Sequence, residues 1–249
     1  MPWEAITGFG WEIYLLAAFF VALGASIQGG VGIGFGMFAA PFMALVEPRL
    51  VPGTILLLGF FVAAMVVLRE YSQVDYHGLG WSLGGRLFGS AVAGGTVAMV
   101  PESVFGVLFS VIILAAIMLS IIGVRLMPTR PNLVGAGVLS GYMGTITSVG
   151  APPMALVYQH RPGPTIRATM GAFLAVGTLI SVIALALAGR FGMLDLVFSA
   201  ALAPPMFLGF WLSRYTLRFV DQGRARVFIL SLTAMAAVVL LVRSVTMSF

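Results

Sequence analysis

The stretch Ile13–Val46 reads IYLLAAFFVALGASIQGGVGIGFGMFAAPFMALV and contains no charged residue. As one helix it would be about 51 Å long, whereas a membrane span needs about 20 residues to cross roughly 30 Å of hydrocarbon. Its middle is interrupted by glycines at Gly29, Gly30, Gly32, Gly34 and Gly36. We therefore predict two passes with a non-helical turn between them, either as full spans or as a re-entrant hairpin.

A second stretch, Pro131–His160, has the same character. It carries no acidic or basic residue other than its final histidine, and Gly150, Pro152 and Pro153 fall within it. A single helix over this range would be about 45 Å long, again too long for one crossing. It is likewise predicted to make two passes.

The composition places the whole chain in the membrane. Hydrophobic residues make up 60% of it and charged residues only 8%, against about 25% charged in soluble domains. Six further uncharged runs fit one pass each, and the polar segment Glu70–Arg86 is interpreted as a loop. The runs are 50–68, 87–101, 103–124, 168–189, 196–213 and 227–242. The sequence thus predicts an all-α, polytopic transmembrane helical bundle.

The thirteen basic residues are all arginines, scattered between apolar runs, so we interpret them as topology signals rather than as a nucleic-acid surface. If each broken run makes two passes and the N-terminus lies outside, ten arginines face the cytoplasm and three face outside. One pass per broken run would give seven against six, so the positive-inside rule favours two passes and places both termini outside. The cytoplasmic set is Arg69, Arg86, Arg125, Arg130, Arg161, Arg167, Arg214, Arg218, Arg224 and Arg226, and the outer set is Arg49, Arg190 and Arg243.

Five passes in each half predict two inverted-topology repeats, over residues 1–127 and 128–249, each with a broken first hairpin followed by three spans. A shift of 116 residues places Gly34 on Gly150. A shift of 111 instead matches APFMALV at 40–46 to APPMALV at 151–157, but it fits the segment boundaries less well. We prefer the shift of 116.

Broken helices at membrane depth indicate a substrate site. Unpaired backbone groups are too costly in lipid unless they line a cavity or bind protein groups, and the N-terminus of a half-helix carries partial positive charge that suits an anion. Glycine allows close approach to the main chain, and proline keeps the break from becoming helical. The candidate substrate-binding residues are Gln28, Gly30, Gly32, Gly34, Gly36, Thr145, Thr147, Ser148, Gly150 and Pro152.

No Asp or Glu lies inside any apolar run, although proton-driven carriers commonly keep an ionisable group at membrane depth. A membrane potential of about 100 mV drives each exported negative charge by about 2.3 kcal/mol. The sequence therefore favours uncoupled or weakly coupled anion export. The chain has no cysteine, and we predict no metal, no cofactor and no catalytic residue.

The chain resembles the TauE/SafE sulfite exporter family. The residues that carry this resemblance are Gly32, Gly34 and Gly36 followed by Pro41, and the block Gly144–Pro152 (GTITSVGAP). Phe35, Ser148 and Ala151 stand where the family usually has glycine. The resemblance implies a multi-pass protein of the bacterial inner membrane that exports sulfite, an organosulfonate or a similar small anion.

Alternatives remain at this stage. The chain could be an anion channel, whose flux would not saturate with substrate, or a carrier for another small organic anion. An intramembrane enzyme would need a constellation such as Ser–His or Asp–Asp, and two histidines without an intramembrane acid supply little material for one. The predicted partners are a small anion and the lipid bilayer, with a homodimer left open.

Overall fold

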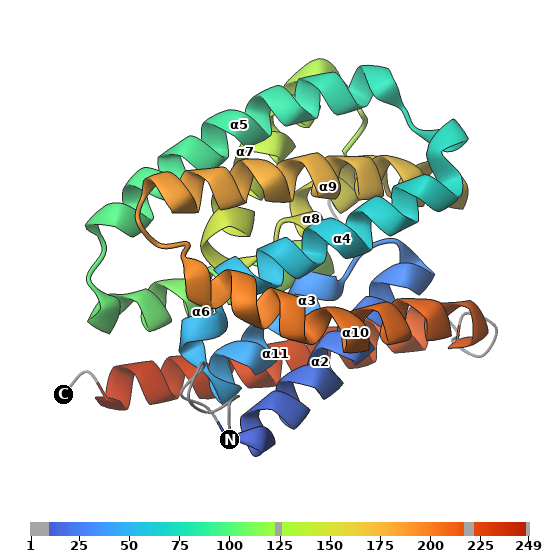
Figure 1. Cartoon of the computed structure of the whole chain (residues 1–249). Coiled ribbons are helices and arrows are strands. Elements are labelled where there is room, and N and C mark those ends of the chain that lie inside the picture. Colours follow the sequence, from blue (N-terminus) through green and yellow to red (C-terminus); the bar gives the residue numbers. More distant parts are fainter. Residues whose placement is uncertain (1–9, 123–125, 217–221, 248–249) are drawn as a thin grey trace.

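The computed structural model describes residues 10–122, 126–216 and 222–247, and every regular element in these ranges is helical (Figure 1). The first half contains two short 3₁₀ turns, η1 (Pro48–Leu50) and η2 (Tyr71–Gln73), between longer helices. These helices are α2 (Trp11–Val31), α3 (Phe35–Val46), α4 (Gly53–Glu70), α5 (Tyr76–Met99) and α6 (Glu102–Ile122). The second half contains α7 (Arg130–Thr147), α8 (Ala151–Tyr158), α9 (Gly163–Leu187), α10 (Met193–Thr216) and α11 (Gln222–Met247).

Six helical segments are long and apolar enough to cross a membrane, and they correspond to α2, α4, α6, α9, α10 and α11. Both predicted helix breaks are confirmed, because α2 ends before α3 begins and α7 ends before α8 begins. The second arm of each broken run is short, with 12 residues in α3 and 8 in α8. At 1.5 Å per residue these arms are about 18 Å and 12 Å long, too short to cross the hydrocarbon alone.

One end of the bundle, named here the Arg69 end, brings together the ends of α4 and α8 and the starts of α5 and α9. Arg167 on α9 forms an ion pair with Glu70 on α4, with Nε 2.9 Å from Oε1. The hydroxyl of Tyr158 on α8 donates to the carboxylate of Asp75, just before α5, at 2.9 Å. These contacts tie four helices together at one level of the molecule.

The opposite end, named the Arg190 end, brings together the ends of α3, α5 and α11. Arg190 donates to the carbonyl of Val100, after α5, at 3.1 Å. Arg243, near the end of α11, donates to the carbonyl of Leu45 on α3 at 3.2 Å. The chain therefore reverses direction between successive full-length helices (Figure 1).

This alternation separates the described arginines by end. Arg130 lies over the ring of Trp81, near the start of α5, at 5.1 Å, so it belongs to the Arg69 end. Arg69, Arg161, Arg167 and Arg214 lie at the same end, and Arg49, Arg190 and Arg243 lie at the other. Arg125 and Arg218 lie outside the described residues, as do the side chains of Arg224 and Arg226.

Arg86 is the exception, and its predicted place in a loop at a helix end is wrong. It lies inside α5 and is 1% exposed. The segment was interpreted as a loop because charges flank it, but the carboxylate of Asp75 accepts the backbone N–H of Gly78 at 3.1 Å and so caps the start of a helix. Eleven residues beyond Asp75, about 16 Å along the axis, Arg86 falls near the middle of α5.

The two halves interlock through helix pairs that join one half to the other. α5 packs against α7 and α10 packs against α2, while α4 lies along α9 and α6 along α11. The short arms follow the same scheme, since α3 contacts α11 and α8 contacts α6. The first arms of both broken runs are therefore held by a helix of the opposite half (Figure 1).

Glycines allow α5 and α7 to approach to backbone contact. A Cβ at Gly85 or Gly89 would meet the carbonyl oxygens of Val134 or Val138, and a Cβ at Gly137 would meet that of Ser82. Small residues at such crossings are the usual means by which membrane helices gain packing energy. This close pairing positions the polar face of α5 against the broken helix α7.

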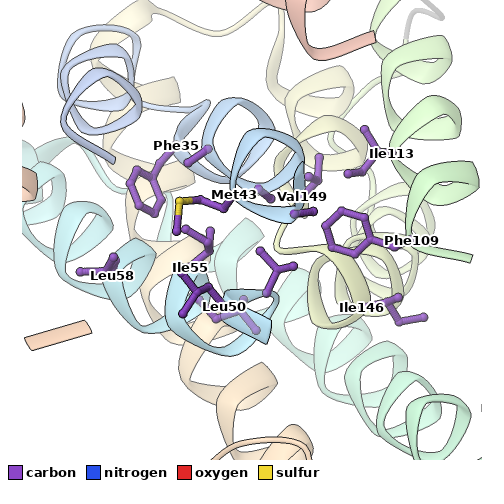
Figure 2. Packing of buried hydrophobic residues seen from close by; sticks show 14 of the residues in the cluster. Phe35, Met43, Leu50, Ile55, Leu58, Phe109, Ile113, Ile146 and Val149 are labelled. Carbon is purple, nitrogen blue, oxygen red and sulfur yellow. The ribbon is translucent and has the colours of Figure 1, made fainter. Parts of the chain in front are cut away.

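The core forms around the short helix α3. Phe35 and Met43 of α3 pack with Ile55 of α4, Phe109 of α6 and Val149 of the second break, all less than a tenth exposed (Figure 2). Since hydrocarbon chains are as apolar as these side chains, the gain comes from tight packing rather than from escape from water. The packing fixes both breaks inside one rigid core.

Candidate functional site

The first break lies between α2 and α3 and depends on two glycines. Gly32 ends α2 with φ of 88° and donates its N–H to the carbonyl of Gln28 at 2.7 Å. Gly34 precedes α3 with φ of 121°, and both values lie in the left-handed region that side chains disfavour. The side-chain oxygen of Gln28 accepts the N–H of Phe35 at 3.0 Å. The chain thus leaves one helix and enters another within three residues.

The second break also begins with a residue in the left-handed region, but it is built from different residues. Ser148 ends α7 with φ of 64° and donates its N–H to the carbonyl of Gly144 at 2.8 Å. The hydroxyl of Thr147 accepts the N–H of Val149 at 3.2 Å, and Gly150 precedes α8. Ser148 lies 116 positions after Gly32, as Gly150 does after Gly34. The residues that end α2 and α7 are thus separated by the same number of positions as the residues that precede α3 and α8.

The two breaks meet. Gly36, in the first turn of α3, packs directly on the carbonyl of Ser148, and a Cβ at that position would stand 3.0 Å from the carbonyl carbon and nearer still to the oxygen. A small cavity of about 30 Å³ lies between them. Its lining comes from α2, α3, α4, α8, α9 and both breaks, and its polar side chains are Gln28, Ser148 and Thr178.

Backbone donors from both short helices face this region. Gly36 and Met37 are the second and third residues of α3, whose N–H groups have no acceptor within the helix. No hydrogen bond from either group is found among the described residues. In α8 the corresponding positions are Pro152 and Pro153, which have no N–H to leave unpaired. Ala151 is then the first donor of α8, and it also lines the cavity.

A buried guanidinium lies behind the second break. Arg86 donates from Nη1 to the hydroxyl of Ser140 at 2.8 Å and from Nη2 to the hydroxyl of Ser181 at 3.5 Å. Its Cζ lies 5.0 Å from the centre of the Phe173 ring, a cation–π contact. A Cβ at Gly150 would come within 2.8 Å of Nη1. Gly150 therefore touches the cavity on one side and Arg86 on the other.

The structure brings together five of the predicted site residues. Gln28, Gly34, Gly36, Ser148 and Gly150 all line the cavity.

The other five predicted residues lie off the cavity. Thr145 donates to Ser181 at 2.8 Å, in the shell around Arg86, and Thr147 donates to the carbonyl of Met143 at 2.7 Å within its own helix. Gly32 packs on Arg167, while Gly30 and Pro152 are buried in helix α2 and helix α8.

Sequence reasoning missed Arg86 and its neighbours Ser140 and Ser181. One signal could have found them: if Asp75 is taken as a helix cap, Arg86 falls on the same helical face as Ser82 and the other buried residues of α5. A charge on the small-residue face of a span is a candidate functional residue.

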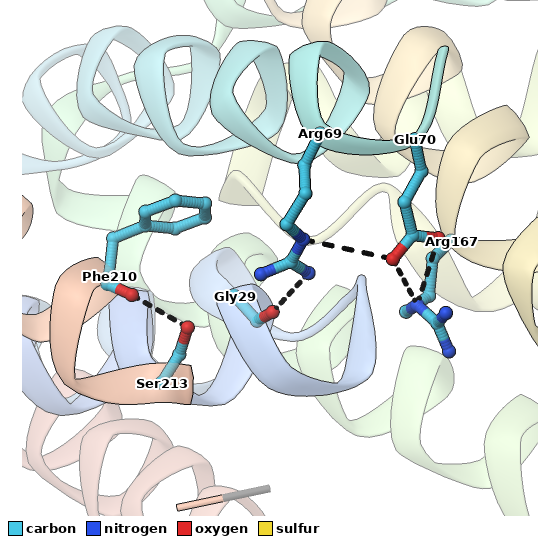
Figure 3. A network of polar contacts seen from close by, with 6 residues as sticks. All are labelled: Gly29, Arg69, Glu70, Arg167, Phe210 and Ser213. Atoms are coloured by element: carbon cyan, nitrogen blue, oxygen red, sulfur yellow. Dashed lines mark hydrogen bonds and ion pairs between the residues drawn. The ribbon is translucent and has the colours of Figure 1, made fainter. Parts of the chain in front are cut away.

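A polar network closes the Arg69 end over the first break (Figure 3). Arg69 donates to the carbonyl of Gly29, near the end of α2, at 2.7 Å. Its Nε lies 3.7 Å from Glu70, which also binds Arg167 at 2.9 Å. Arg167 in turn packs on Gly32. The network therefore joins α2, α4 and α9 beside the first break.

Asp75 anchors the neighbouring corner of the same end. Burial by itself raises the pKa of this carboxyl, but the hydrogen bonds from the Gly78 N–H and the Tyr158 hydroxyl outweigh that effect and hold the pKa below its ordinary value. The Asp75 N–H also donates to the hydroxyl of Thr169 at 3.0 Å. The carboxylate of Asp75 thus links α5 to α8, and its backbone N–H links this corner to α9.

The long apolar helices, two opposed helix breaks and a shared internal cavity define a helical membrane transporter. The family model described as Sulfite exporter TauE/SafE matches residues 15–240, and the chain belongs to this family. No curated protein and no solved structure matches the chain. The protein is therefore a multi-pass membrane protein of a family that exports sulfite and related anions.

Proposed function

We propose that this protein carries a small anion out of the cytoplasm through the cavity where the two helix breaks meet. The observation that carries the proposal is the convergence of both breaks on one cavity, lined by Gly36 on one side and Gly150 on the other. The N-termini of α3 and α8 both border this cavity, so their partial positive charges favour a bound anion. The N–H groups of Gly36, Met37 and Ala151 are the proposed ligand donors.

The cavity size supports a small anion such as sulfite over a larger organosulfonate such as sulfoacetate. A volume of about 30 Å³ exceeds the 10–15 Å³ or so that one water needs, but not by a large factor. Its polar side chains, Gln28, Ser148 and Thr178, offer no general base. This supports transport rather than catalysis.

The helix pairs support the proposal that residues 1–127 and 128–249 are inverted repeats. Exchanging α2–α6 with α7–α11 in order converts the α5–α7 pair into the α10–α2 pair. The same exchange leaves the α4–α9 and α6–α11 pairs unchanged, and it converts α3–α11 into α8–α6, all of which are observed pairs. In inverted repeats the substrate site lies at the repeat interface, which is where both breaks lie.

The arginines support an orientation with the Arg69 end in the cytoplasm of a bacterial inner membrane. Five described arginines lie at that end and three at the other, as the positive-inside rule requires. The start of α2 and the end of α11 then face the periplasm. In this orientation the membrane potential drives anion export by about 2.3 kcal/mol per charge at 100 mV, without a coupled proton.

Sulfite flux in proteoliposomes, measured at fixed voltage and varied pH, tests this function. A carrier is expected to saturate with sulfite, to exchange internal for external sulfite, and to respond to voltage without a proton gradient. Flux that never saturates would support the channel alternative. An absolute requirement for a proton gradient, with no response to voltage, would contradict uncoupled export.

A matched pair of variants tests the site itself. Ser148→Gly removes a cavity-lining hydroxyl at a position whose φ suits glycine, and it is expected to weaken the apparent affinity for sulfite. Thr96→Ala removes an exposed hydroxyl that bonds only to the carbonyl of Val92 in its own helix, at 3.0 Å, and should leave the affinity unchanged. Equal affinities in both variants would remove Ser148 from the site.

A further inference from the structure

Arg86 is a buried positive charge, and no acid pairs with it in the described part of the chain. It is 1% exposed, and the ion pairs found among the described residues belong to Arg49, Arg69 and Arg167. Its hydrogen-bond partners in that part of the chain are two hydroxyls, those of Ser140 and Ser181. The Nε atom is buried with no partner among the described residues.

Such a charge is costly unless something neutralises it. A guanidinium keeps its proton at neutral pH, so it does not escape the cost of burial by becoming neutral. Burial of an ion without a counter-ion is strongly unfavourable, and charged groups inside membrane spans usually face a substrate pathway. Two hydrogen bonds are found for its five N–H donors. No partner is found for the remaining donors among the described residues.

The surroundings of Arg86 are built to hold this side chain beside the cavity. Glycines stand where larger residues would displace it: a Cβ at Gly144 would lie 3.2 Å from Nη2, one at Gly150 would lie 2.8 Å from Nη1, and one at Gly177 would collide with Nε. Gly150 also lines the cavity between the breaks. Gly150 therefore lies between the guanidinium and the proposed anion site.

We propose that Arg86 is the counter-charge of the transported anion and that it selects ligands of charge −1. This inference rests on the function proposed above and specifies its substrate class: a monovalent oxyanion, which for sulfite is hydrogen sulfite. One negative charge makes the loaded site neutral. A dianion would leave one negative charge buried in the membrane, and a zwitterion would leave the positive charge of Arg86 unbalanced.

Two probes of similar shape and different charge test this selection. Methanesulfonate and sulfate both place four groups around a tetrahedral sulfur, but they carry charges of −1 and −2. We expect methanesulfonate to inhibit sulfite flux, and to raise the melting temperature of the purified protein, at concentrations at least about tenfold lower than sulfate. At fixed total sulfite, flux should follow the hydrogen sulfite fraction as pH is varied.

Variants of Arg86 assign the selection to this residue. Arg86→Gln removes the counter-charge, so it is expected to weaken methanesulfonate inhibition by about 10- to 100-fold, the low end of what close charge pairs contribute, and to abolish the preference over sulfate. Arg86→Lys keeps the charge and should keep the preference at lower affinity, because the planar fork is lost.

The outcomes separate this inference from the proposed function. If the wild-type protein carries sulfite but binds sulfate as well as methanesulfonate, the charge selection is wrong and export stands. If Arg86→Gln keeps the wild-type preference for methanesulfonate over sulfate, the proposal that Arg86 selects the charge is also wrong. If the wild-type protein carries no anion, the proposed function itself is wrong. The wild-type comparison decides the charge selection even where Arg86→Gln does not fold.

Discussion

Replacing Gly36 with alanine is expected to separate the two helix breaks. The added Cβ would lie well under 3.0 Å from the carbonyl oxygen of Ser148, and real Cβ atoms essentially never make contacts this short. The obstacle is backbone rather than a flexible side chain. The start of α3 must therefore move away from the second break. Relieving such overpacking costs about 1–3 kcal/mol, whereas alanine in place of glycine recovers up to about 1 kcal/mol of helix propensity.

With the full recovery, the net loss is up to about 2 kcal/mol, which corresponds to a melting temperature lower by up to about 8 °C for a chain of this size. If the displacement removes one backbone hydrogen bond to the anion, the apparent sulfite affinity should also fall by about 10- to 100-fold. Thermal unfolding in detergent and flux in proteoliposomes measure the two effects. Gly84→Ala is the matched control, because nothing lies within 4 Å of its Cβ position. Wild-type stability together with wild-type flux in Gly36→Ala would refute the reasoning.

Further predictions concern the helix contacts around the site. Gly137→Ala places a Cβ on the Ser82 carbonyl and should lower the unfolding free energy by about 1–3 kcal/mol, whereas Gly135→Ala, with open space around it, should not lower it. Tyr158→Phe removes a hydrogen bond to the Asp75 carboxylate and should cost about 1–2 kcal/mol at neutral pH, with a smaller loss if water replaces the hydroxyl. Because the pKa of Asp75 is lowered in the folded protein, its stabilisation is present above about pH 4 and is lost as the pH falls toward the folded pKa. Melting temperatures of wild type and Asp75→Asn from pH 7 to pH 3 should therefore converge at the acid end, and a constant difference would contradict the linkage.

Several features of the fold could be predicted from local sequence. The two over-long apolar runs and their glycines predicted helix breaks at the positions where α2 and α7 end, because apolar length and helix-breaking residues act within a few positions of the chain. The arginine distribution predicted the reversal at each break, and the described ends of the helices agree with it. The membrane class and the family followed from the same segments.

The cavity itself could be predicted only in part. Gln28, Gly34 and Gly36 were proposed because they lie at a break, and they do line it. Thr147 has the same local character, yet its hydroxyl turns back to bond Val149 and Met143. The direction of a side chain at a break depends on the backbone φ and ψ angles there. Glycine and serine do not adopt these angles with equal ease.

Arg86 marks the boundary between what the sequence determined by itself and what only the tertiary structure decided. Hydrophobic length, helix breakers and charge distribution are properties of single segments, so the sequence alone determined the membrane class and the two helix breaks. The neighbours of Arg86 come from Ser140 on α7, Ser181 on α9 and Gly150 at the second break, three segments separated along the chain. These residues come together only because α5, α7 and α9 pack closely. The distance between the helices is set by glycine contacts between their backbones, and these contacts form only when the helices assemble.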